Sequence, residues 1–342
     1  MTDQILFEEF GVGNLVRYSA PALAPWLDSF GDNEKYKEKE TKYKNFQLVI
    51  DSGFDATWIV PVIYGIPYFR AIRKLPIAGR FLNGYLREVV SFRHYNIVEE
   101  PVLVNAIKHQ TCYVAVDYNE TLNKLTRLKK NPRELINSDL SLSYVLPNNK
   151  TDFLGHPVLD KSKISKAELQ TLRNSLEGKH MKVNGYGDED DEENDYGNNG
   201  GLNASQSLLL TDERFLIPEL LFHPQLAGVY KSGLIQTIKS SLDAVPELLQ
   251  PLLVNNIACI GGTSNIPGFA ERIVKDLDPE VPVEAQTRVS DYTHITGDTS
   301  LLSWYAGKSF FANGGFEKIK MTKADYAEFG AEYAQDKFSF RL

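Results

Sequence analysis

Two runs of apolar, largely β-branched residues flank a short polar turn in the first quarter of the chain. Segment 46–63 reads FQLVIDSGFDATWIVPVI, with Asp51, Ser52 and Gly53 between the two runs. β-Branched residues favour strands, and an Asp-x-Gly sequence between them favours a turn, so the pattern predicts a β-hairpin. Glycine lets the backbone approach a ligand such as phosphate, and an aspartate beside such a turn can hold magnesium through water.

A helical period follows this hairpin. The residues that share one helix face are Phe81, Leu82, Tyr85, Leu86, Val89 and Val90. We therefore predict a helix that starts at Gly79 and Arg80. Free amides and the helix dipole at such a start favour an anion, although spacing alone equally allows a simple helix entry with a surface arginine. A second helix is predicted over 99–110, with Lys108 and His109 near its end, and then a strand over 113–116.

The second half of the chain contains a strand, a double glycine and a helix in succession. An apolar strand over 256–260 ends at Gly261, Gly262 and Thr263, and a helix begins after Gly268. This arrangement brings bare backbone close to a flat or charged ligand, but many tight turns look the same. Further helices are predicted over 234–242 and 303–308. Thr322 and Asp325 have the spacing of a capping box.

Size and composition narrow the class of protein. A chain of 342 residues with 42% hydrophobic residues suits two domains, or one duplicated fold with a long insertion. The apolar runs are too short to span a bilayer, and 1–10 lacks the features of a signal peptide, so we expect an intracellular protein without a membrane partner. Cys112 and Cys259 lie in apolar segments and are expected to be buried free thiols. No Cys/His cluster has zinc spacing, so no metal site built by the protein alone is expected.

The charge is unevenly distributed. A net charge of −8 argues against broad binding to the DNA backbone. Segment 188–195 reads DEDDEEND between glycines, and the tract over 185–201 is predicted to be disordered. It is either a solvated loop or a contact for a basic partner such as a histone. The whole region 129–211 is polar and predicts an insertion or a loosely built subdomain.

Seven blocks, in this order, resemble actin and the actin-related proteins. They are VIDSGFDATWIVPV, IAGRFLNGYL, VNAIKHQTCYVAVDY, ERFLIPELLFHP, IACIGGTSNIPGF, SWYAGKSFF and TKADYAEFG. The segment YLREVVSFRHYNIVEEPVLVN and the FEEF start are most similar to the sixth class of actin-related proteins. The resemblance implies an α/β fold of the actin, sugar-kinase and heat-shock ATPase type.

The same resemblance implies an N-terminally incomplete form of that fold, because the chain starts at the block that follows actin's first phosphate hairpin and small subdomain. It implies that 1–44 and 300–342 belong to the first actin-like domain. Segments 45–128 and 212–299 then form the second domain, and 129–211 is the insertion.

The nucleotide-binding positions carry over in part. Asp51, Ser52 and Gly53 match the second phosphate hairpin of actin, Gly79 and Arg80 match the pair beside the nucleotide, and Lys108 matches a nucleotide-contacting lysine. Gly261, Gly262 and Thr263 match the adenosine loop.

Other positions depart from the actin pattern. Phe54 and Asp55 replace an aspartate and a glycine, and the Asp55 carboxylate would crowd and repel phosphates. Trp58 replaces the histidine near the hydrolytic water, and His109 replaces a ribose-binding glutamate. Ile266 replaces a bulky aromatic residue. Ser300 lies near the place of a lysine that is absent.

The resemblance implies a non-catalytic subunit of a Swr-type (in animals SRCAP-type) chromatin remodeller, which exchanges ordinary histone dimers for dimers carrying the Z variant of histone 2A. Its partners would be the remodeller ATPase and neighbouring subunits, with histones or nucleosomes as further candidates, and its location the nucleus and also the cytoplasm. The alternative is an ATP-binding switch, with magnesium, that hydrolyses ATP weakly or not at all, because phosphoryl transfer needs a magnesium clamp and a positioned water. A filament-forming actin is disfavoured by the sequence divergence.

Overall fold

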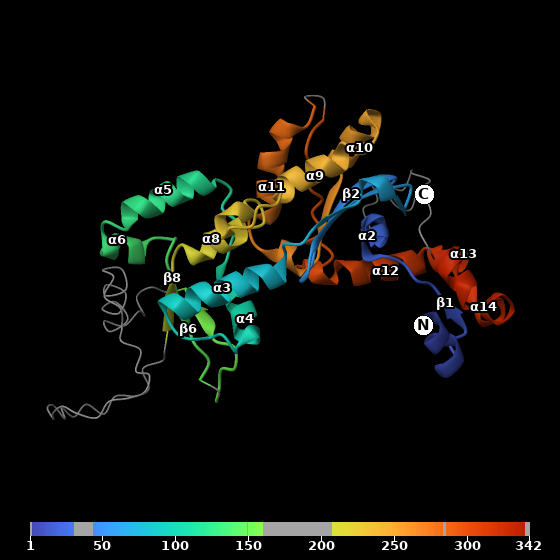
Figure 1. Ribbon diagram of the computed structural model, residues 1–342, viewed down its shortest axis with the longest axis horizontal. Coiled ribbons are helices and arrows are strands. Elements are labelled where there is room, and N and C mark those ends of the chain that lie inside the picture. Colours follow the sequence, from blue (N-terminus) through green and yellow to red (C-terminus); the bar gives the residue numbers. More distant parts are fainter. Residues whose placement is uncertain (1, 31–43, 149, 160–206, 283–284, 339–342) are drawn as a thin grey trace. The chain divides into compact units, whose positions relative to one another are not determined.

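The computed structural model describes residues 2–30, 44–148, 150–159, 207–282 and 285–338, so the acidic tract over 185–201 lies outside the described residues. Contacts divide the chain into two compact units (Figure 1). Unit 1 comprises Met1–Leu82 and Glu219–Leu342, and unit 2 comprises Asn83–Pro218. These limits differ from the segments proposed above from sequence. The assignment of those segments to two actin-like domains stays a prediction.

Unit 1 is built on a mixed sheet. Strand β2 (Phe46–Ser52) pairs antiparallel with β3 (Thr57–Ile63) and parallel with β9 (Ile257–Ile260), which confirms the predicted hairpin and the predicted buried strand. The short strands β4 (Ile66–Pro67) and β5 (Arg73–Leu75) extend it beyond β3. Because side chains alternate along a strand, the valines and isoleucines of β2 and β3 supply both faces of the sheet.

Helices cover both faces of this sheet. One face, with Val49, Val60 and Val62, forms a core with residues of the helical segment η2 (Ala24–Phe30) and of α12 (Leu302–Ala312). Helices α9 (Leu234–Leu242) and α10 (Gln250–Val254) also contact the strands, and α11 (Phe269–Leu277) packs against α9. Helices α9, α11 and α12 agree with the sequence predictions, and α3 (Gly79–Arg93) also begins and runs as predicted. The helix predicted over 99–110 is confirmed as α4 (Pro101–Thr111).

The two ends of the chain meet in a smaller cluster within unit 1. Strand β1 (Asn14–Leu15) pairs antiparallel with β10 (Met321–Thr322), and Phe7 stacks on Tyr326 with ring centroids 4.7 Å apart. The other elements of this cluster are α1 (Thr2–Gln4), the π-helix η1 (Ile5–Glu9) and α14 (Lys323–Phe338). Helix α2 (Ala20–Leu23) contacts the central sheet and α12, and α13 (Gly315–Ile319) follows α12. Thr322 and Asp325 exchange backbone-to-side-chain hydrogen bonds of 2.9 and 3.1 Å, which confirms the predicted capping box.

Unit 2 carries a small antiparallel sheet built from the described parts of 129–211, the region predicted to be an insertion or a loosely built subdomain. Its strands, in the order β7-β6-β8, are β6 (Leu142–Val145), β7 (His156–Val158) and β8 (Ser207–Leu210). Helices α4 (Pro101–Thr111), α5 (Tyr118–Leu128) and α6 (Pro132–Asn137) accompany it, and α8 (Glu213–Glu219) leads back into unit 1. The strands at the described ends of 129–211 were not predicted, because short apolar runs such as LSYV and SLLL were hidden by the polar average. The assignment of 129–211 as an insertion or subdomain stays a prediction.

The predicted strand over 113–116 is also wrong. This segment is irregular, and Tyr113 N donates one hydrogen bond of 2.9 Å to Arg214 O. Val114 and Ala115 are buried as a connection between α4 and α5, so their apolar character reflects burial and not strand pairing. Both cysteines are buried free thiols, as predicted, and burial raises the pKa of each to about 12.

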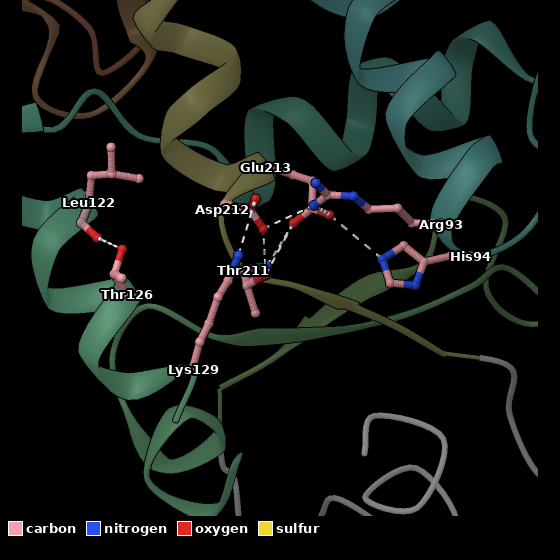
Figure 2. A network of polar contacts seen from close by, with 8 residues as sticks. All are labelled: Arg93, His94, Leu122, Thr126, Lys129, Thr211, Asp212 and Glu213. Carbon is pink, nitrogen blue, oxygen red and sulfur yellow. Dashed lines mark hydrogen bonds and ion pairs between the residues drawn. The ribbon is translucent and has the colours of Figure 1, made fainter. Parts of the chain in front are cut away.

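A polar network surrounds the buried carboxylate of Glu213 in unit 2, just after the end of β8 (Figure 2). Arg93 Nη1 donates to Glu213 Oε1 at 2.7 Å and to Asp212 Oδ1 at 3.0 Å, and Thr211 N donates to Glu213 Oε2 at 2.9 Å. The carboxylate of Glu213 is almost fully buried. Burial alone would raise its pKa, but hydrogen bonds and charge from His94, Arg93 and the Thr211 amide hold the pKa at about 2.

We expect Glu213→Gln to destabilise the protein by about 3 kcal/mol at pH 7, because it removes the charge of a buried carboxylate that the partly exposed Arg93 and the Thr211 amide stabilise. The pKa of Glu213 is lower in the folded state than its ordinary 4.5, so this stabilisation is present above pH 4.5 and is lost as the pH falls toward 2. Thermal unfolding at pH 7 and pH 3 measures both effects. Glu99→Gln, at an exposed position of the same unit, is the control. An equal loss at both pH values would contradict the assignment.

Candidate functional site

The hairpin turn is anchored by buried hydroxyl groups. Ser52 lies opposite Thr57 in the β2–β3 register, and their hydroxyl oxygens are 2.9 Å apart. Thr57 Oγ1 donates to Ile77 O at 3.0 Å, so the pair connects the hairpin to the segment before α3. Both side chains are fully buried. The predicted ligand residue Ser52 therefore holds the turn in place through its side chain, and its hydroxyl faces the protein.

Three of the predicted segments converge on the carbonyl oxygen of Gly53. It accepts a hydrogen bond of 3.2 Å from Gly79 N and one of 2.6 Å from Thr263 Oγ1. The hairpin turn, the start of α3 and the double-glycine loop thus lie together within unit 1, although more than 200 residues separate the first from the last. The sequence predicted that these residues belong to one site, and the structure places Gly53, Gly79 and Thr263 in contact.

Gly261 is the position where glycine is strictly required. Its φ is +90°, and a Cβ there would lie 2.5 Å from Ser52 O and 2.9 Å from Asp51 Oδ1. Thr299 holds the same loop, because Gly261 N donates to Thr299 O at 3.1 Å and Thr299 Oγ1 donates to Gly261 O at 2.7 Å. Thr299 was missed by the sequence analysis, which had no motif for it. Gly262 follows, beside the side chain of Ser300.

Of the two alternatives that the spacing allowed, the start of α3 agrees with the helix entry with a surface arginine, because the amides of its first two residues are already bonded. Gly79 N is bonded to Gly53 O, and Arg80 N donates to Phe54 O at 2.7 Å. The reason is long-range: the hairpin turn folds onto the helix start and supplies the carbonyl oxygens that an anion would have replaced.

The side chain of Arg80 is also engaged. Its guanidinium lies 2.6 Å from Asp55 Oδ1 and 5.5 Å from the ring centroid of Phe54. Phe54 and Asp55 are the two residues that depart from the actin pattern. The Asp55 carboxylate would therefore repel a phosphate and also compete with it for the guanidinium of Arg80. Both partners are largely exposed, so this ion pair is weak and exchangeable.

Trp58 lies on β3 opposite Asp51 and is 39% exposed. The Lys74 Nζ sits 5.1 Å from the centroid of its ring, a cation–π contact. An indole donates a hydrogen bond through its N–H and accepts none, so it cannot act as a general base for water. Ile266, another residue that departs from the actin pattern, is buried in the protein.

Lys108 belongs to unit 2 and is only 1% exposed. Its Nζ donates to Asn105 Oδ1 at 3.2 Å, and Asn83 Nδ2 donates to the same oxygen at 3.2 Å. Burial lowers the pKa of Lys108 to about 8. The two asparagines were not predicted. The neighbouring His109 is exposed, so Lys108 and His109, which the sequence analysis placed together near the end of one helix, differ in burial.

Asp51 is the candidate for holding magnesium. It is half-buried at the end of β2, and burial raises its pKa from 3.8 to about 6. Among the described residues, no group of three or more His, Cys, Asp and Glu side chains is placed to hold a metal ion. Bound ATP and magnesium would meet one carboxylate and the bare backbone at Gly261. They would also meet the start of α3, whose first two amides and arginine are already bonded to the hairpin turn, so the residues present fit a nucleotide only in part.

Residues 1–339 match the actin family model, so the chain belongs to the actin family, and its α/β fold is the one expected for that family. Among the curated relatives, "Actin-like protein ARP6" of Candida glabrata is 34% identical, over 99% of this chain and 72% of that protein. The protein of the same name from Saccharomyces cerevisiae is 33% identical, over 97% of this chain and 71% of the relative. "Actin-related protein 6" of Neurospora crassa is 29% identical, over 99% and 70%. The resemblance to the sixth class of actin-related proteins is therefore confirmed.

Comparison with the sequence analysis separates the nine predicted site residues into two sets. Those that unit 1 brings close together are Asp51, Ser52, Gly53, Gly79, Arg80, Gly261, Gly262 and Thr263. Lys108 lies in unit 2. Their role in binding a nucleotide stays a prediction.

We expect Asp51→Asn to stabilise the protein without ligand by about 2 kcal/mol at pH 7.5. The pKa of Asp51 is higher in the folded state than its ordinary 3.8, so ionisation penalises folding as the pH rises from about 4 to about 6. The gain should shrink to near zero at pH 4. Thermal unfolding at the two pH values measures this difference. Asp243→Asn, at an exposed aspartate of unit 1, should change stability little at either pH.

Proposed function

We propose that this chain is a non-catalytic actin-related subunit of a chromatin-remodelling complex that exchanges ordinary nucleosomal histone dimers for dimers carrying the Z variant of histone 2A. In this role it acts as a docking and assembly platform in the nucleus, and it is also present in the cytoplasm. Its partners are a Swr- or SRCAP-type remodeller ATPase and the neighbouring subunits, with histones or nucleosomes as further contacts. The relatives named above as actin-like or actin-related proteins of the sixth class support this proposal.

The observation that carries the non-catalytic part is the set of bonds at the hairpin turn. Arg80 is paired with Asp55, and the amides of Gly79 and Arg80 are bonded to carbonyl oxygens of the turn. Phosphoryl transfer needs cations and amides that face the phosphates and a positioned water. These groups are bonded within the protein, and Trp58 stands at the position of the water-associated histidine. The site therefore best supports a protein that keeps the actin-type fold but does not hydrolyse ATP.

A second candidate is an ATP-binding switch with weak or no hydrolysis. Two observations favour it: the bare backbone at Gly261, which stays in a conformation that only glycine adopts readily, and the half-buried Asp51 beside it. Binding of ATP would then compete with the Asp55–Arg80 ion pair, which is exposed and therefore weak.

We expect the wild-type chain to bind fluorescent ATP weakly in the presence of magnesium, and Asp55→Asn to bind it severalfold more tightly, because the variant frees Arg80 and removes a negative charge. Asp139→Asn is a matched control, since Asp139 is likewise an exposed aspartate paired with a lysine, 2.9 Å from Lys124 Nζ. It should leave the affinity unchanged. Tight, magnesium-dependent binding by the wild type would favour the switch over the docking platform.

Affinity capture from nuclear extract tests the partner. We expect the chain to retain a large helicase-like remodeller ATPase, identified by mass spectrometry, and Asp55→Asn to retain it equally, because docking does not use the nucleotide site. The Saccharomyces cerevisiae relative serves as a parallel bait. If that relative recovers such an ATPase and this chain recovers none, the proposed subunit role is wrong.

A further inference from the structure

A cluster of basic side chains lies where α5 meets α6 in unit 2. Its members are Lys124, Arg127, Lys129, Lys130 and Arg133, and segment 124–133 contains no Asp or Glu. All five residues are exposed, and Figure 1 shows the two helices side by side. We call these five residues the α5–α6 basic cluster. In a chain with a net charge of −8, such a local excess of positive charge is an electrostatic feature that attracts an anionic partner.

Two members of the cluster form ion pairs within the protein, and both pairs are weak. Lys124 Nζ lies 2.9 Å from Asp139 Oδ1, and Lys129 Nζ lies 3.7 Å from Asp212 Oδ2 (Figure 2). The two lysine side chains are 52% and 44% exposed, so solvent screens these attractions. An anionic ligand can therefore exchange with the carboxylates at little cost.

The other three members have no partner in the part of the chain that the structure describes. The side chains of Arg127, Lys130 and Arg133 form no ion pair with another described residue, and the nearby Glu134 carboxylate accepts from Asn131 Nδ2 at 2.7 Å. The dipole of α5 favours Arg127 in its last turn, but the dipole of α6 disfavours Arg133 in its first turn. Like charges so close together also repel one another. The folded chain alone does not account for this arrangement, whereas an external anion does.

The surroundings of the cluster narrow the class of anion. Segment 119–139 contains no aromatic residue, whereas proteins that bind single-stranded nucleic acids stack bases on aromatic side chains. Among the described residues, no large exposed apolar side chain lies in this segment, so a protein partner would lack an apolar anchor. Histones are basic and would be repelled. Arginine, by contrast, binds phosphate with two parallel hydrogen bonds. These features favour the backbone of a nucleic-acid duplex.

We propose that the α5–α6 basic cluster is a contact for the phosphate backbone of double-stranded DNA. The inference rests on the proposed function and makes it more specific, because it names DNA, and not a histone, as the part of a nucleosome that this surface meets. The contact is independent of base sequence, since phosphates carry no sequence information. It weakens steeply with salt, because each neutralised phosphate releases counterions.

The test measures the affinity of the full chain for a fluorescently labelled DNA duplex by anisotropy over a range of salt concentrations. We expect the triple variant Arg127→Gln, Lys130→Gln and Arg133→Gln to bind at least about tenfold more weakly at low salt. The slope of log affinity against log salt should fall by about 3, one for each lost phosphate contact. Thermal unfolding of the variant should match or exceed that of the wild type, because like-charge repulsion is removed.

A second triple variant is the matched control. Arg70→Gln, Lys231→Gln and Arg288→Gln remove two arginines and one lysine from exposed positions of unit 1, so the net charge changes equally. This variant should bind the duplex as the wild type does. A synthetic peptide with the acidic sequence of 186–197 represents an acidic protein partner. The proposal is overturned if the cluster variant keeps its affinity and slope, if the control variant weakens binding equally, or if the peptide binds the wild type more tightly than the duplex.

Capture of the remodeller ATPase separates this inference from the proposed function. In nuclease-treated nuclear extract, the cluster variant should recover the ATPase as well as the wild type does, because docking then involves no DNA. If the wild type recovers the ATPase but binds DNA without using the cluster, the present inference alone is wrong. If DNA binding depends on the cluster but no ATPase is recovered, the proposed subunit role is wrong and the DNA contact remains a property of the chain.

Discussion

Strand β2 has a neighbour on each side, and both pairings are needed to create the site. On one side β3 folds back from the turn after Ser52, and on the other β9 arrives from the far end of the chain and runs parallel to it. Parallel pairing brings the ends of β2 and β9 to the same edge of the sheet. Gly261 lies so close to Ser52 there that a Cβ added to Gly261 would be 2.5 Å from Ser52 O. The positive φ of Gly261, the bond from Thr263 to Gly53 and the anchoring of α3 all follow from this register.

At this edge of the sheet, groups that could contact the phosphates of a nucleotide are bonded to other groups of the protein. A carbonyl oxygen lies where an anion would meet the helix start, and a carboxylate meets the guanidinium of Arg80. The arrangement keeps the local backbone bonded without nucleotide. The assembly role proposed above requires that property, because the folded state then does not depend on a bound ligand.

Elements with a strong period were predictable from the sequence. The helix from Gly79 and the helix after Gly268 followed from one-faced apolar spacing, and the hairpin followed from β-branched runs around Asp51-Ser52-Gly53. The strand over 113–116 failed because burial and strand pairing leave the same apolar signature over four residues. The partners of Arg80 and Lys108 could not be predicted, since a side-chain contact depends on how distant segments pack. Thr299, 38 residues from the glycine that it holds, shows the same limit.

Unit 2 is inserted between the two halves of unit 1, which are residues 1–82 and 219–342. This topology orders events during synthesis. In the sheet of unit 1, Leu48 of β2 pairs with Ile257 of β9. The ribosome must therefore synthesise some 200 further residues after β2 before β9 is available to pair with it. Unit 2 is continuous in sequence and can fold in that interval. Until β9 arrives, one edge of the apolar strand β2 is open to chaperones and to aggregation, and the long loop that must close makes this step slow.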